Sequence, residues 1–327
     1  MPFVRENLQR QGISQDAADI IIASWRPATK KSYRSAIQKW ILFCARGQIN
    51  PVRAPVTVVL DCLTEEFHKG NSYSSVNTLR SAISAIVAPI DVSPIGSHPL
   101  VKRFMTGVFN LRPAMPRYNF TWDVNIVFKY LKELGPGEKL PLKGLTMKLV
   151  MLIALISGQR CQTLSLLDLD QVNVTRSNVT FVVTKLTKTS RVGSKPISVV
   201  LSEYPHDEHL CVMKTLREYL IKTRTFRGRE RSLFLSYTSP HKRVGSETIS
   251  RWIKMTLQDA GIDIGRFKAH STRSAACSAA LQRGVPLDVI MTTAQWARSS
   301  TFAKFYNKTI VPASQKFADA VLSCEAK

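Results

Sequence analysis

The second half of this sequence carries a small set of side chains suited to phosphodiester chemistry. They are Arg160, Lys188, His270, Arg273, Trp296 and Tyr306. Breaking a phosphodiester requires an in-line nucleophile, cations on the non-bridging oxygens and a proton for the leaving oxygen. The set can supply all three without a metal ion, which points to DNA strand transfer through a phosphotyrosine.

The two arginines and the histidine are suited to holding phosphate and moving a proton. A guanidinium stays charged and donates two parallel hydrogen bonds to phosphate. Arg160 follows an apolar helix and Gly158, so we expect its side chain at the edge of a cleft. Arg273 lies one helical turn after His270 and shares its helix face, where the imidazole can accept or relay a proton near neutral pH.

The other three residues complete the reaction. Lys188, expected at the turn-proximal end of a strand, can protonate the departing 5′ oxygen, and the indole of Trp296 is a hydrogen-bond donor. Tyr306 has the one oxygen of the set that can form a stable ester with phosphate. Each residue alone has an ordinary structural explanation, so the weight lies on their order and spacing.

Helical spacing predicts the elements that precede this set. We expect four helices, at about 29–47, 56–69, 75–87 and 99–109. Their solvent faces carry the basic side chains that we expect on DNA, namely Lys30, Lys31, Arg34, Lys39 and Arg80. Two prolines at 113 and 116 break the helical pattern. The predicted domains are therefore a helical DNA-clamping domain over 1–116 and a catalytic domain over 117–327.

The second domain reads as mixed α and β. A helix through Val127 ends near Gly135, and an apolar helix follows at about 145–156. Strand-like runs at 172–175, 179–184 and 197–201 predict a small antiparallel sheet. Further helices are expected at about 208–223, 246–260, 271–283, 287–292, 299–306 and 312–324.

Composition indicates the partner. The chain has 46 Lys and Arg against 23 Asp and Glu, a net charge of +23 and a pI of 10.1. Residues 1–117 hold 15 basic and 7 acidic side chains and the remainder holds 31 and 16, so neither part is a detached basic tail. With 44% hydrophobic residues, the sequence predicts two packed domains that bind double-stranded DNA.

The remaining composition bounds the compartment and the cofactors. Six widely spaced cysteines form no Cys-x-x-Cys pair, and the most apolar stretch, at 149–156, is too short to cross a bilayer. We therefore expect an intracellular protein without a membrane role. His206 and His209 lie among residues typical of a solvated helix start, and no further pair completes a ligand set, so no metal site and no cofactor are expected.

The motifs around the set resemble those of the tyrosine recombinases, the phage integrase family. The matching segments are Gly158-Gln159-Arg160, Thr187-Lys188-Thr189, Ala269-His270-Ser271-Thr272-Arg273, Gln295-Trp296 and Phe302-Ala303-Lys304-Phe305-Tyr306. The resemblance covers nearly the whole chain. It implies a mainly α fold with a small antiparallel β-sheet, in which a helical core-binding domain precedes an α+β catalytic domain.

Finer motifs resemble the recombinases of eukaryotic mobile elements, the DIRS-like retrotransposons and the cryptons. They are Asn77-Thr78-Leu79-Arg80-Ser81-Ala82-Ile83, Gly158-Gln159-Arg160-Cys161-Gln162-Thr163-Leu164 and Lys188-Thr189-Ser190-Arg191. This resemblance implies integration of a mobile element, and a nuclear location if the host is a eukaryote. The resemblance to the tyrosine recombinase family also implies a tetramer on paired DNA sites, in which the helix at 312–324 either docks on a neighbour or closes its own domain.

The sequence departs from the family at one position and is ambiguous at another. Many relatives have an acidic residue where Thr163 stands, so an orienting carboxylate is either missing or replaced by Asp168 or Asp170. Lys185 is an alternative to Lys188 as the hairpin lysine. The departure leaves open a domesticated DNA-binding protein without turnover. A further alternative is a topoisomerase-like enzyme that uses the same phosphotyrosine chemistry on one strand at a time.

Overall fold

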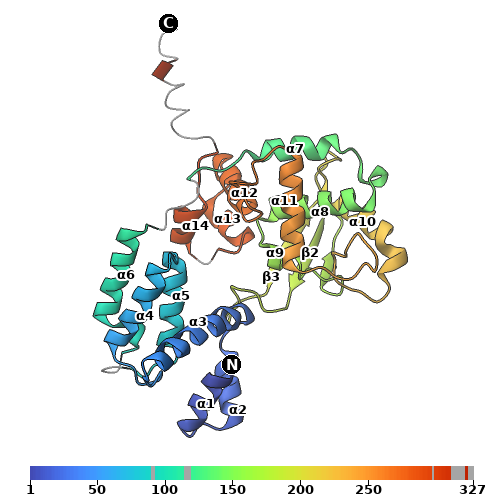
Figure 1. Ribbon diagram of the computed structural model, residues 1–327. Coiled ribbons are helices and arrows are strands. Elements are labelled where there is room, and N and C mark those ends of the chain that lie inside the picture. Colours follow the sequence, from blue (N-terminus) through green and yellow to red (C-terminus); the bar gives the residue numbers. More distant parts are fainter. Residues whose placement is uncertain (90–92, 114–118, 297, 311–320, 323–327) are drawn as a thin grey trace. The chain divides into compact units, whose positions relative to one another are not determined.

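The computed structural model describes residues 1–89, 93–113, 119–296, 298–310 and 321–322. The chain divides into two compact units, Met1–Pro116 and Arg117–Lys327 (Figure 1). Each unit has its own hydrophobic core and is described by itself.

The first unit is helical throughout its described part. Its elements are α1 (Pro2–Arg10), α2 (Gln15–Ala23), α3 (Pro27–Arg46), α4 (Val56–His68), α5 (Tyr73–Ser84), the 3₁₀ turn η1 (Ile95–Ser97) and α6 (Pro99–Leu111). The four helices expected from the sequence correspond to α3, α4, α5 and α6. The pair α1 and α2 was not predicted, although the Ser14 hydroxyl, which accepts the Ala17 N–H, is a recognisable start signal for α2.

The core of the first unit explains why α3 is amphipathic. Trp40 and Cys44 are fully buried, and the indole N–H of Trp40 donates to the Pro51 carbonyl oxygen at 2.9 Å. Lys31 and Arg34 lie on the opposite, exposed face of the same helix. Burial of one face thus leaves a basic face free, as the helical spacing predicts.

The second unit combines helices with one small sheet. Its elements are α7 (Val124–Glu133), the 3₁₀ turn η2 (Gly137–Lys139), α8 (Leu142–Ser157), α9 (Cys161–Leu164), β1 (Val172–Val174), β2 (Asn178–Val183), β3 (Ile197–Ser202), α10 (Val212–Arg227), α11 (Ser246–Asp259), α12 (Ser271–Gln282), α13 (Leu287–Thr293) and α14 (Ser299–Phe305). The prediction of a mainly α chain with a small antiparallel sheet is confirmed. The helix expected from residue 208 begins at Val212.

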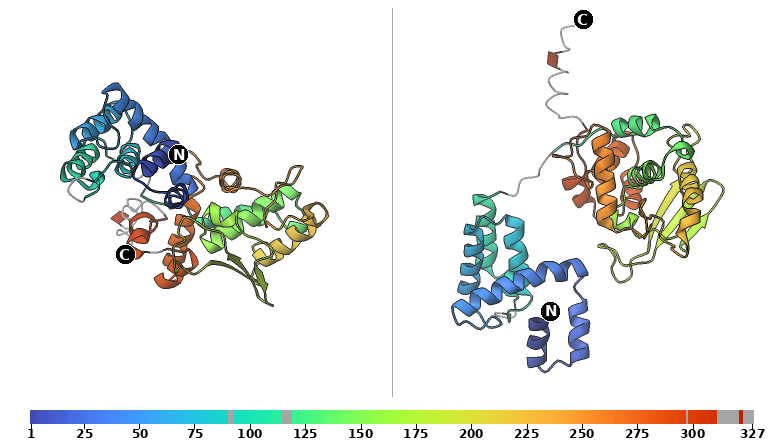
Figure 2. Two further views of the ribbon diagram at one scale, coloured as in Figure 1. Left: turned by 90° about the horizontal axis from the view of Figure 1, so that it is seen from below. Right: turned by 45° about the vertical axis from the view of Figure 1, so that its right-hand side comes forward.

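The three strands form an antiparallel sheet in the order β1-β2-β3, which lies along one side of the second unit beside α8 and α10 (Figure 2). Val179 faces Leu201 and Val183 faces Ile197 across the β2–β3 ladder. Buried residues alternate with partly buried ones along β2 and with exposed ones along β3, so the sheet covers the core with one face. The strand β2 ends at Val183, so the prediction that Lys188 lies at the end of a strand is wrong: it lies in the loop that joins β2 to β3.

Helix α8 is the central element of the second unit. It is buried on nearly every face, with α10, α11 and α12 packed around it. It ends at Gly158, whose φ of 57° is a left-handed conformation that favours glycine. A Cβ atom there would lie 3.1 Å from the Cβ of Ala294. This close turn carries the chain directly from the core to Arg160.

Parts of the sequence-based prediction fall outside the described residues. They are most of the connector at 112–117 and all of the helix at 312–324 except Val321 and Leu322, which are exposed. No helix among the described residues is long and apolar enough to span a membrane.

Candidate active site

The site is built where α12 meets the end of α14. His270 lies at the start of α12, and Tyr306 follows the last residue of α14. The Nε2 atom of His270 lies 2.7 Å from the phenolic oxygen of Tyr306, and the two rings meet edge to face with centroids 5.6 Å apart. This hydrogen bond joins a candidate proton acceptor to a candidate nucleophile.

Trp296 and Arg273 lie against the same phenol. The Trp296 and Tyr306 ring centroids are 3.8 Å apart, and the Arg273 guanidinium carbon lies 3.8 Å from the Trp296 ring centroid. Arg273 is 2% exposed and donates one hydrogen bond to the Ala294 carbonyl oxygen. Its Nε and Nη1 atoms have no hydrogen-bond partner among the described residues. A buried guanidinium with unsatisfied donors is suited to binding an anion.

Arg160, which lies between α8 and α9, completes this arrangement. It occupies the N-cap position of α9, and its guanidinium carbon lies 5.7 Å from the Trp296 ring centroid. Burial lowers the pKa of Arg160, and the nearby phenol of Tyr306 opposes that shift. Two guanidinium groups thus approach one indole ring.

Trp296 packs into a small hydrophobic core formed by α12, α13 and α14. It packs with Phe302 of α14 and Cys277 of α12 in a small buried cluster. Its indole N–H makes no hydrogen bond of ordinary geometry among the described residues, and the weakly accepting sulfur of Cys277 lies beside it. The indole therefore keeps a donor available for an additional acceptor.

The electrostatics favour a neutral imidazole at physiological pH. Surrounding protein atoms, followed by the charges of Arg273, Arg160 and Lys188, lower the pKa of His270 to about 4. The residue is exposed to solvent, which moderates these effects, and a bound phosphate would oppose them. When Nδ1 carries the ring proton, Nε2 can accept the phenol proton of Tyr306.

Arg273 remains a cation in spite of its burial. Burial and the charge of Arg160 lower its pKa to about 10, still well above neutral pH. We call Arg160, Arg273 and Trp296 the phosphate clamp, or the clamp. It is therefore positively charged under the conditions in which His270 is neutral.

The loop that joins β2 to β3 contains both candidate lysines and places them in different surroundings. Lys185 lies 3.7 Å from the Asp168 carboxylate. Lys188 is exposed, its backbone N–H donates to the Gln162 side chain at 3.2 Å, and its charge contributes to the low pKa of His270. Of the two, Lys188 is the one whose charge acts at the site.

The two carboxylates considered as substitutes at the departure from the family are engaged elsewhere. Asp168 lies beside Lys185, and Asp170 lies 3.4 Å from Arg231. Neither carboxylate contributes to the pKa of His270 or Arg160. Thr163 itself is buried. Among the described residues, the position of the missing acid is therefore not filled by another carboxylate.

Two serines of α12 contact the nucleophile segment and were missed by the sequence analysis. Ser278 donates a hydrogen bond to the Tyr306 carbonyl oxygen at 2.9 Å, and Ser274 lies 3.5 Å from the same oxygen. The four-residue steps from His270 to Ser274 and Ser278 were a usable signal, since they place all three on one helix face. Nothing in the sequence showed that the tyrosine segment would lie on that face.

The residues predicted to bind DNA in the first unit have different environments. Lys31 and Arg34 are exposed and Lys30 is partly exposed. Lys39 forms an ion pair with Glu66, and Arg80 donates to the Gly96 carbonyl oxygen at 3.1 Å. The first three are therefore free to reach a ligand, whereas the last two already have partners within the protein.

The second unit has two cavities of note, of which one borders the site. One, of about 530 Å³, lies between the β2–β3 loop and α13, with Trp296, Arg191 and Lys195 in its lining. It borders the site and carries the positive charge expected for binding a DNA backbone. The other, of about 690 Å³, contains none of the candidate catalytic residues.

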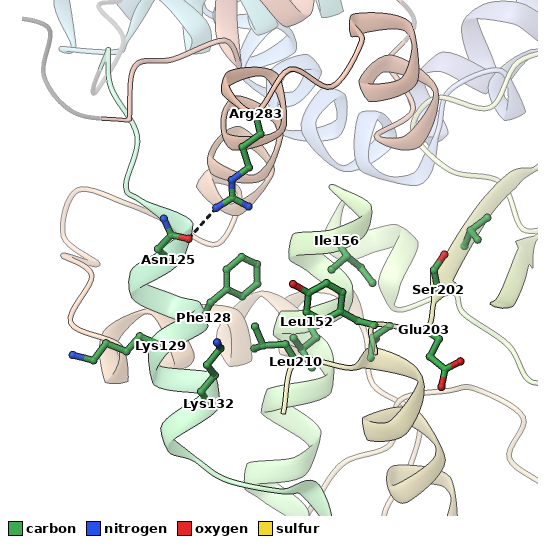
Figure 3. Close-up of a pocket in the computed structure, with 13 residues that line it drawn as sticks. Asn125, Phe128, Lys129, Lys132, Leu152, Ile156, Ser202, Glu203, Leu210 and Arg283 are labelled. Carbon is green, nitrogen blue, oxygen red and sulfur yellow. Dashed lines mark hydrogen bonds between the residues drawn. The ribbon is translucent and has the colours of Figure 1, made fainter. Parts of the chain in front are cut away.

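This second cavity, which we call the α7 groove, is lined by Asn125, Phe128, Lys129, Lys132, Leu152, Ile156, Val200, Ser202, Glu203, Tyr204, Leu210, Val212 and Arg283. Phe128 and Leu152 form part of its apolar floor, and Lys129 points away from it (Figure 3). At one end Arg283 donates to the Asn125 side chain at 2.9 Å. Its exposed apolar side chains suit it to packing against protein rather than to chemistry.

Metal ligands are not gathered at any point of the described chain. No group of three or more His, Cys, Asp or Glu side chains lies close enough to hold an ion there. His206 instead packs edge to face with Tyr204. Arg273 lies over the Tyr306 ring and Arg160 interacts electrostatically with the same phenol, while the charge of Lys188 acts on the neighbouring His270.

Several solved structures share this fold. A λ integrase fragment, solved as a dimer bound to a COC′ core site, is 15% identical, with 89% of this chain and 93% of that chain covered and a TM-score of 0.53. The XerH site-specific recombinase bound to difH is 12% identical over 87% and 78% of the chains, with a TM-score of 0.57. The Tn1549 transposon integrase bound to transposon right-end DNA is 15% identical over 84% and 86%, with a TM-score of 0.53.

Comparison of the sequence itself identifies the family. No curated protein matches this chain. The sequence profile of the phage integrase family matches residues 138–310, which include every candidate catalytic residue. The family expected from the motifs is thereby confirmed: the chain belongs to the phage integrase family and is a tyrosine recombinase.

Proposed function

We propose that this protein cleaves and rejoins DNA through Tyr306 without a metal ion. The phenolic oxygen attacks the phosphorus and His270 takes its proton. The bond to the 5′ oxygen breaks, and Lys188 supplies the proton that this oxygen needs. The products are a 3′-phosphotyrosine and a free 5′ hydroxyl. A partner strand's hydroxyl then reverses the step and completes the exchange.

The two arginines stabilise the charge that develops on the phosphate. Arg160 and the two unpartnered nitrogens of Arg273 supply charged donors, and the Trp296 indole supplies a neutral one. Donors fixed before the reaction stabilise a transition state at little reorganisation cost. The ester stores the energy of the broken bond, so the reaction needs no ATP.

One observation carries this proposal more than any other. The 2.7 Å hydrogen bond between His270 and Tyr306 lies directly beside a buried guanidinium with two unsatisfied donors. A tyrosine that served only to pack would need neither neighbour. Together they form a nucleophile, its base and an anion-binding group in one place.

The first unit supports the proposal as a second DNA-binding surface. Lys31 and Arg34 lie one turn apart on an exposed face of α3, and Lys30 lies beside them. We assign them to backbone phosphates, with Lys39 and Arg80 joining if their present contacts exchange. Because many phosphate contacts make affinity strongly salt-dependent, removing this face should reduce the slope of log K against log salt by roughly 0.9 per lost contact.

We further propose that the biological reaction is recombination or integration of a mobile element. The finer motifs around Arg80, Arg160 and Lys188 support this, and so does the fold shared with the Tn1549 transposon integrase, which was solved with its transposon end. The protein would act wherever its DNA is, which is the nucleus in a eukaryotic host. The substitution at Thr163 favours the rival hypothesis, a domesticated DNA-binding protein that has lost turnover.

Exchange between two duplexes requires four cleavage sites, and we propose a homotetramer on paired sites. The λ integrase relative was solved as a dimer on DNA, which supports assembly on the substrate. Within this chain, Thr309 accepts a hydrogen bond from the Thr121 N–H at 2.8 Å, and Ile310 packs against the core. We therefore assign the docking role to the residues after Ile310.

A covalent selection tests the proposed reaction and needs no defined target sequence. Nicked duplexes with a randomised segment are incubated with the protein, because loss of the short strand beyond the nick traps any phosphotyrosine. Adducts that survive detergent are recovered by protease digestion and sequenced. We expect enriched sequences that form adducts in EDTA. Enrichment by binding alone, with no detergent-stable adduct, would establish the domesticated DNA-binding protein instead.

The same selected sites separate recombination from relaxation. A recombinase should give joint products that require two sites, with a yield that depends on their pairing. A topoisomerase-like enzyme should relax a supercoiled circle that carries one site and give no joint product.

A further inference from the structure

The backbone that follows the nucleophile is fastened to α12 by one buried hydroxyl. Ser278 is 1% exposed and makes two hydrogen bonds through the same oxygen. It donates to the Tyr306 carbonyl oxygen at 2.9 Å and accepts from the Lys308 N–H at 3.1 Å. A single side chain therefore bridges the peptide groups on both sides of Asn307.

The same helix also holds the other end of the tyrosine. His270, Ser274 and Ser278 follow one another at four-residue steps on one face of α12. His270 contacts the phenolic oxygen, while the two serines contact the backbone carbonyl. The nucleophile thus lies along one helix face, bound at its reactive end and at its main chain.

The local backbone needs such a partner. The Tyr306 N–H still donates to the Phe302 carbonyl oxygen of α14 at 2.8 Å, but the chain then leaves the helix. Carbonyl groups in the last turn of a helix receive no hydrogen bond from an N–H of that helix, so another donor must satisfy them. Ser278 does this for Tyr306 and also fixes the direction in which the following residues run.

We propose that Ser278 is a positioning residue for the cleavage step: by binding the backbone on both sides of Asn307, it holds Tyr306 in the active site of its own protomer. This inference rests on the proposed function, because it matters only if Tyr306 is the nucleophile. Ser278 does not touch the reacting atoms and acts through the orientation of the tyrosine. Without it, the segment gains freedom and the phenol spends less time in line with the phosphorus.

A purely structural role is the rival explanation, since α12 also carries His270 and Arg273. Alanine is well tolerated in this helix, where Ala275, Ala276 and Ala279 already surround Ser278. Ser278→Ala therefore removes the two hydrogen bonds with little cost to the helix itself. The test must then show whether the phosphate clamp on the same helix still works.

The first measurement is the rate of adduct formation on a saturating concentration of a nicked duplex. We expect Ser278→Ala to slow this step by about ten- to a hundredfold, with DNA affinity unchanged. The matched control is Thr215→Val, which removes another buried helical hydroxyl, bonded to the Cys211 carbonyl oxygen in α10. It should leave the rate unchanged. An unaltered rate in Ser278→Ala would overturn the proposal.

The second measurement isolates the clamp from the tyrosine. In a Tyr306→Phe protein, hydrogen peroxide supplies an external nucleophile. One of its oxygens forms the bond to phosphorus and gives up its proton, while the bond to the 5′ oxygen breaks and that oxygen leaves with a proton from Lys188. Adding Ser278→Ala to this protein should not change the peroxide-driven rate, because the clamp and Lys188 are intact. An equal loss in both assays would show that Ser278 supports the clamp and would refute its positioning role.

These assays also distinguish this inference from the proposed function. If the wild-type protein forms no adduct and the Tyr306→Phe protein gives no peroxide-driven cleavage, the proposed reaction itself fails. If both reactions occur and only the response to Ser278→Ala is absent, the reaction stands and the inference about Ser278 is wrong.

Discussion

The two sides of the candidate site are held in different ways. On the clamp side, Arg273 is buried, stacks on Trp296 and is anchored by a main-chain carbonyl. On the loop side, Lys188 is exposed, and its backbone N–H donates to the Gln162 side chain at 3.2 Å. Further bonds lie within the turn itself, where the Thr187 N–H donates to the Ser190 hydroxyl at 2.9 Å.

This difference separates two tasks of the reaction. Stabilising charge requires fixed donors, because any reorganisation on the way to the transition state costs free energy. Delivering a proton to a leaving group requires reach, and a loop can move with the 5′ oxygen as it departs. We infer that the clamp exists before DNA binds, whereas the lysine is brought into place by the DNA.

The clamp side is tested most severely by removing its buried cation. Arg273→Ala should reduce the rate of adduct formation by about a thousandfold, since a preorganised donor to the developing charge is lost. Single-turnover cleavage of a nicked duplex measures this loss. Arg266→Ala is the control, because Arg266 is an exposed arginine that lies over Phe120, outside the site. Equal losses in the two variants would mean that general DNA affinity, and not the clamp, was measured.

The loop side is tested by changing the leaving group. Lys188→Ala should slow cleavage by about a hundredfold or more, as expected when a general acid is lost. Placing sulfur at the 5′ bridging position should restore the rate, because a thiolate leaves without needing a proton. Lys185→Ala serves as the matched control. If Lys185→Ala is the variant that slows cleavage and responds to sulfur, the assignment of the two lysines must be exchanged.

Charges from both sides lower the pKa of His270, so the change in this pKa on removing each charge compares their effects. We expect a pKa of about 4 in the DNA-free protein. NMR of the imidazole signals should show Arg160→Ala raising this pKa more than Lys188→Ala does, because the arginine has the larger effect. DNA phosphate should raise it further. A pKa that stays near 6.5 in every variant would contradict the described electrostatics.

The same shift has a consequence for stability. The folded protein holds the His270 pKa below its usual 6.5, so the unfolded chain binds this proton first as the pH falls. This residue should therefore lower the free energy of unfolding as the pH decreases from about 6.5 to about 4, and contribute no pH dependence above that range.

The smallest effect on cleavage is expected outside both sides, at the α7 groove. Val200 of β3 is 50% exposed there, and Val174 of β1 is 69% exposed elsewhere on the sheet. If a neighbouring protomer covers the groove, Val200→Glu should leave single-site cleavage unchanged and weaken paired-site complexes, whereas Val174→Glu should affect neither. Light scattering of the DNA complexes measures this. Intact four-subunit complexes with Val200→Glu would exclude the groove as the interface.

The sequence predicted the parts of this molecule that depend on local pattern. The helices α3 to α6, the three strands and the order of the motifs follow from periodicity and from residue type. The apolar helix before Arg160 was also predicted, and it ends where the left-handed Gly158 follows it. Helix α1 was missed because its N-cap, Met1, offers no side-chain hydrogen bond as a start signal.

What the sequence could not give is the set of contacts between distant segments. The bonds from Ser278 to Tyr306 and from Gln162 to Lys188 span 28 and 26 positions, and no local pattern encodes them. Lys188 was placed on a strand because the run before it is rich in β-branched residues. Its position in the loop instead follows from the end of the β2–β3 ladder at Val183.

Identifying the residue that becomes attached to DNA tests the central claim most directly. The wild-type protein is trapped on a nicked duplex in EDTA, the adduct is digested, and the modified peptide is located by mass spectrometry. We predict one DNA-linked residue, Tyr306, and complete loss of the adduct in Tyr306→Phe with DNA affinity nearly unchanged. An adduct on Tyr219 or Tyr237, or one that persists in Tyr306→Phe, would contradict the account.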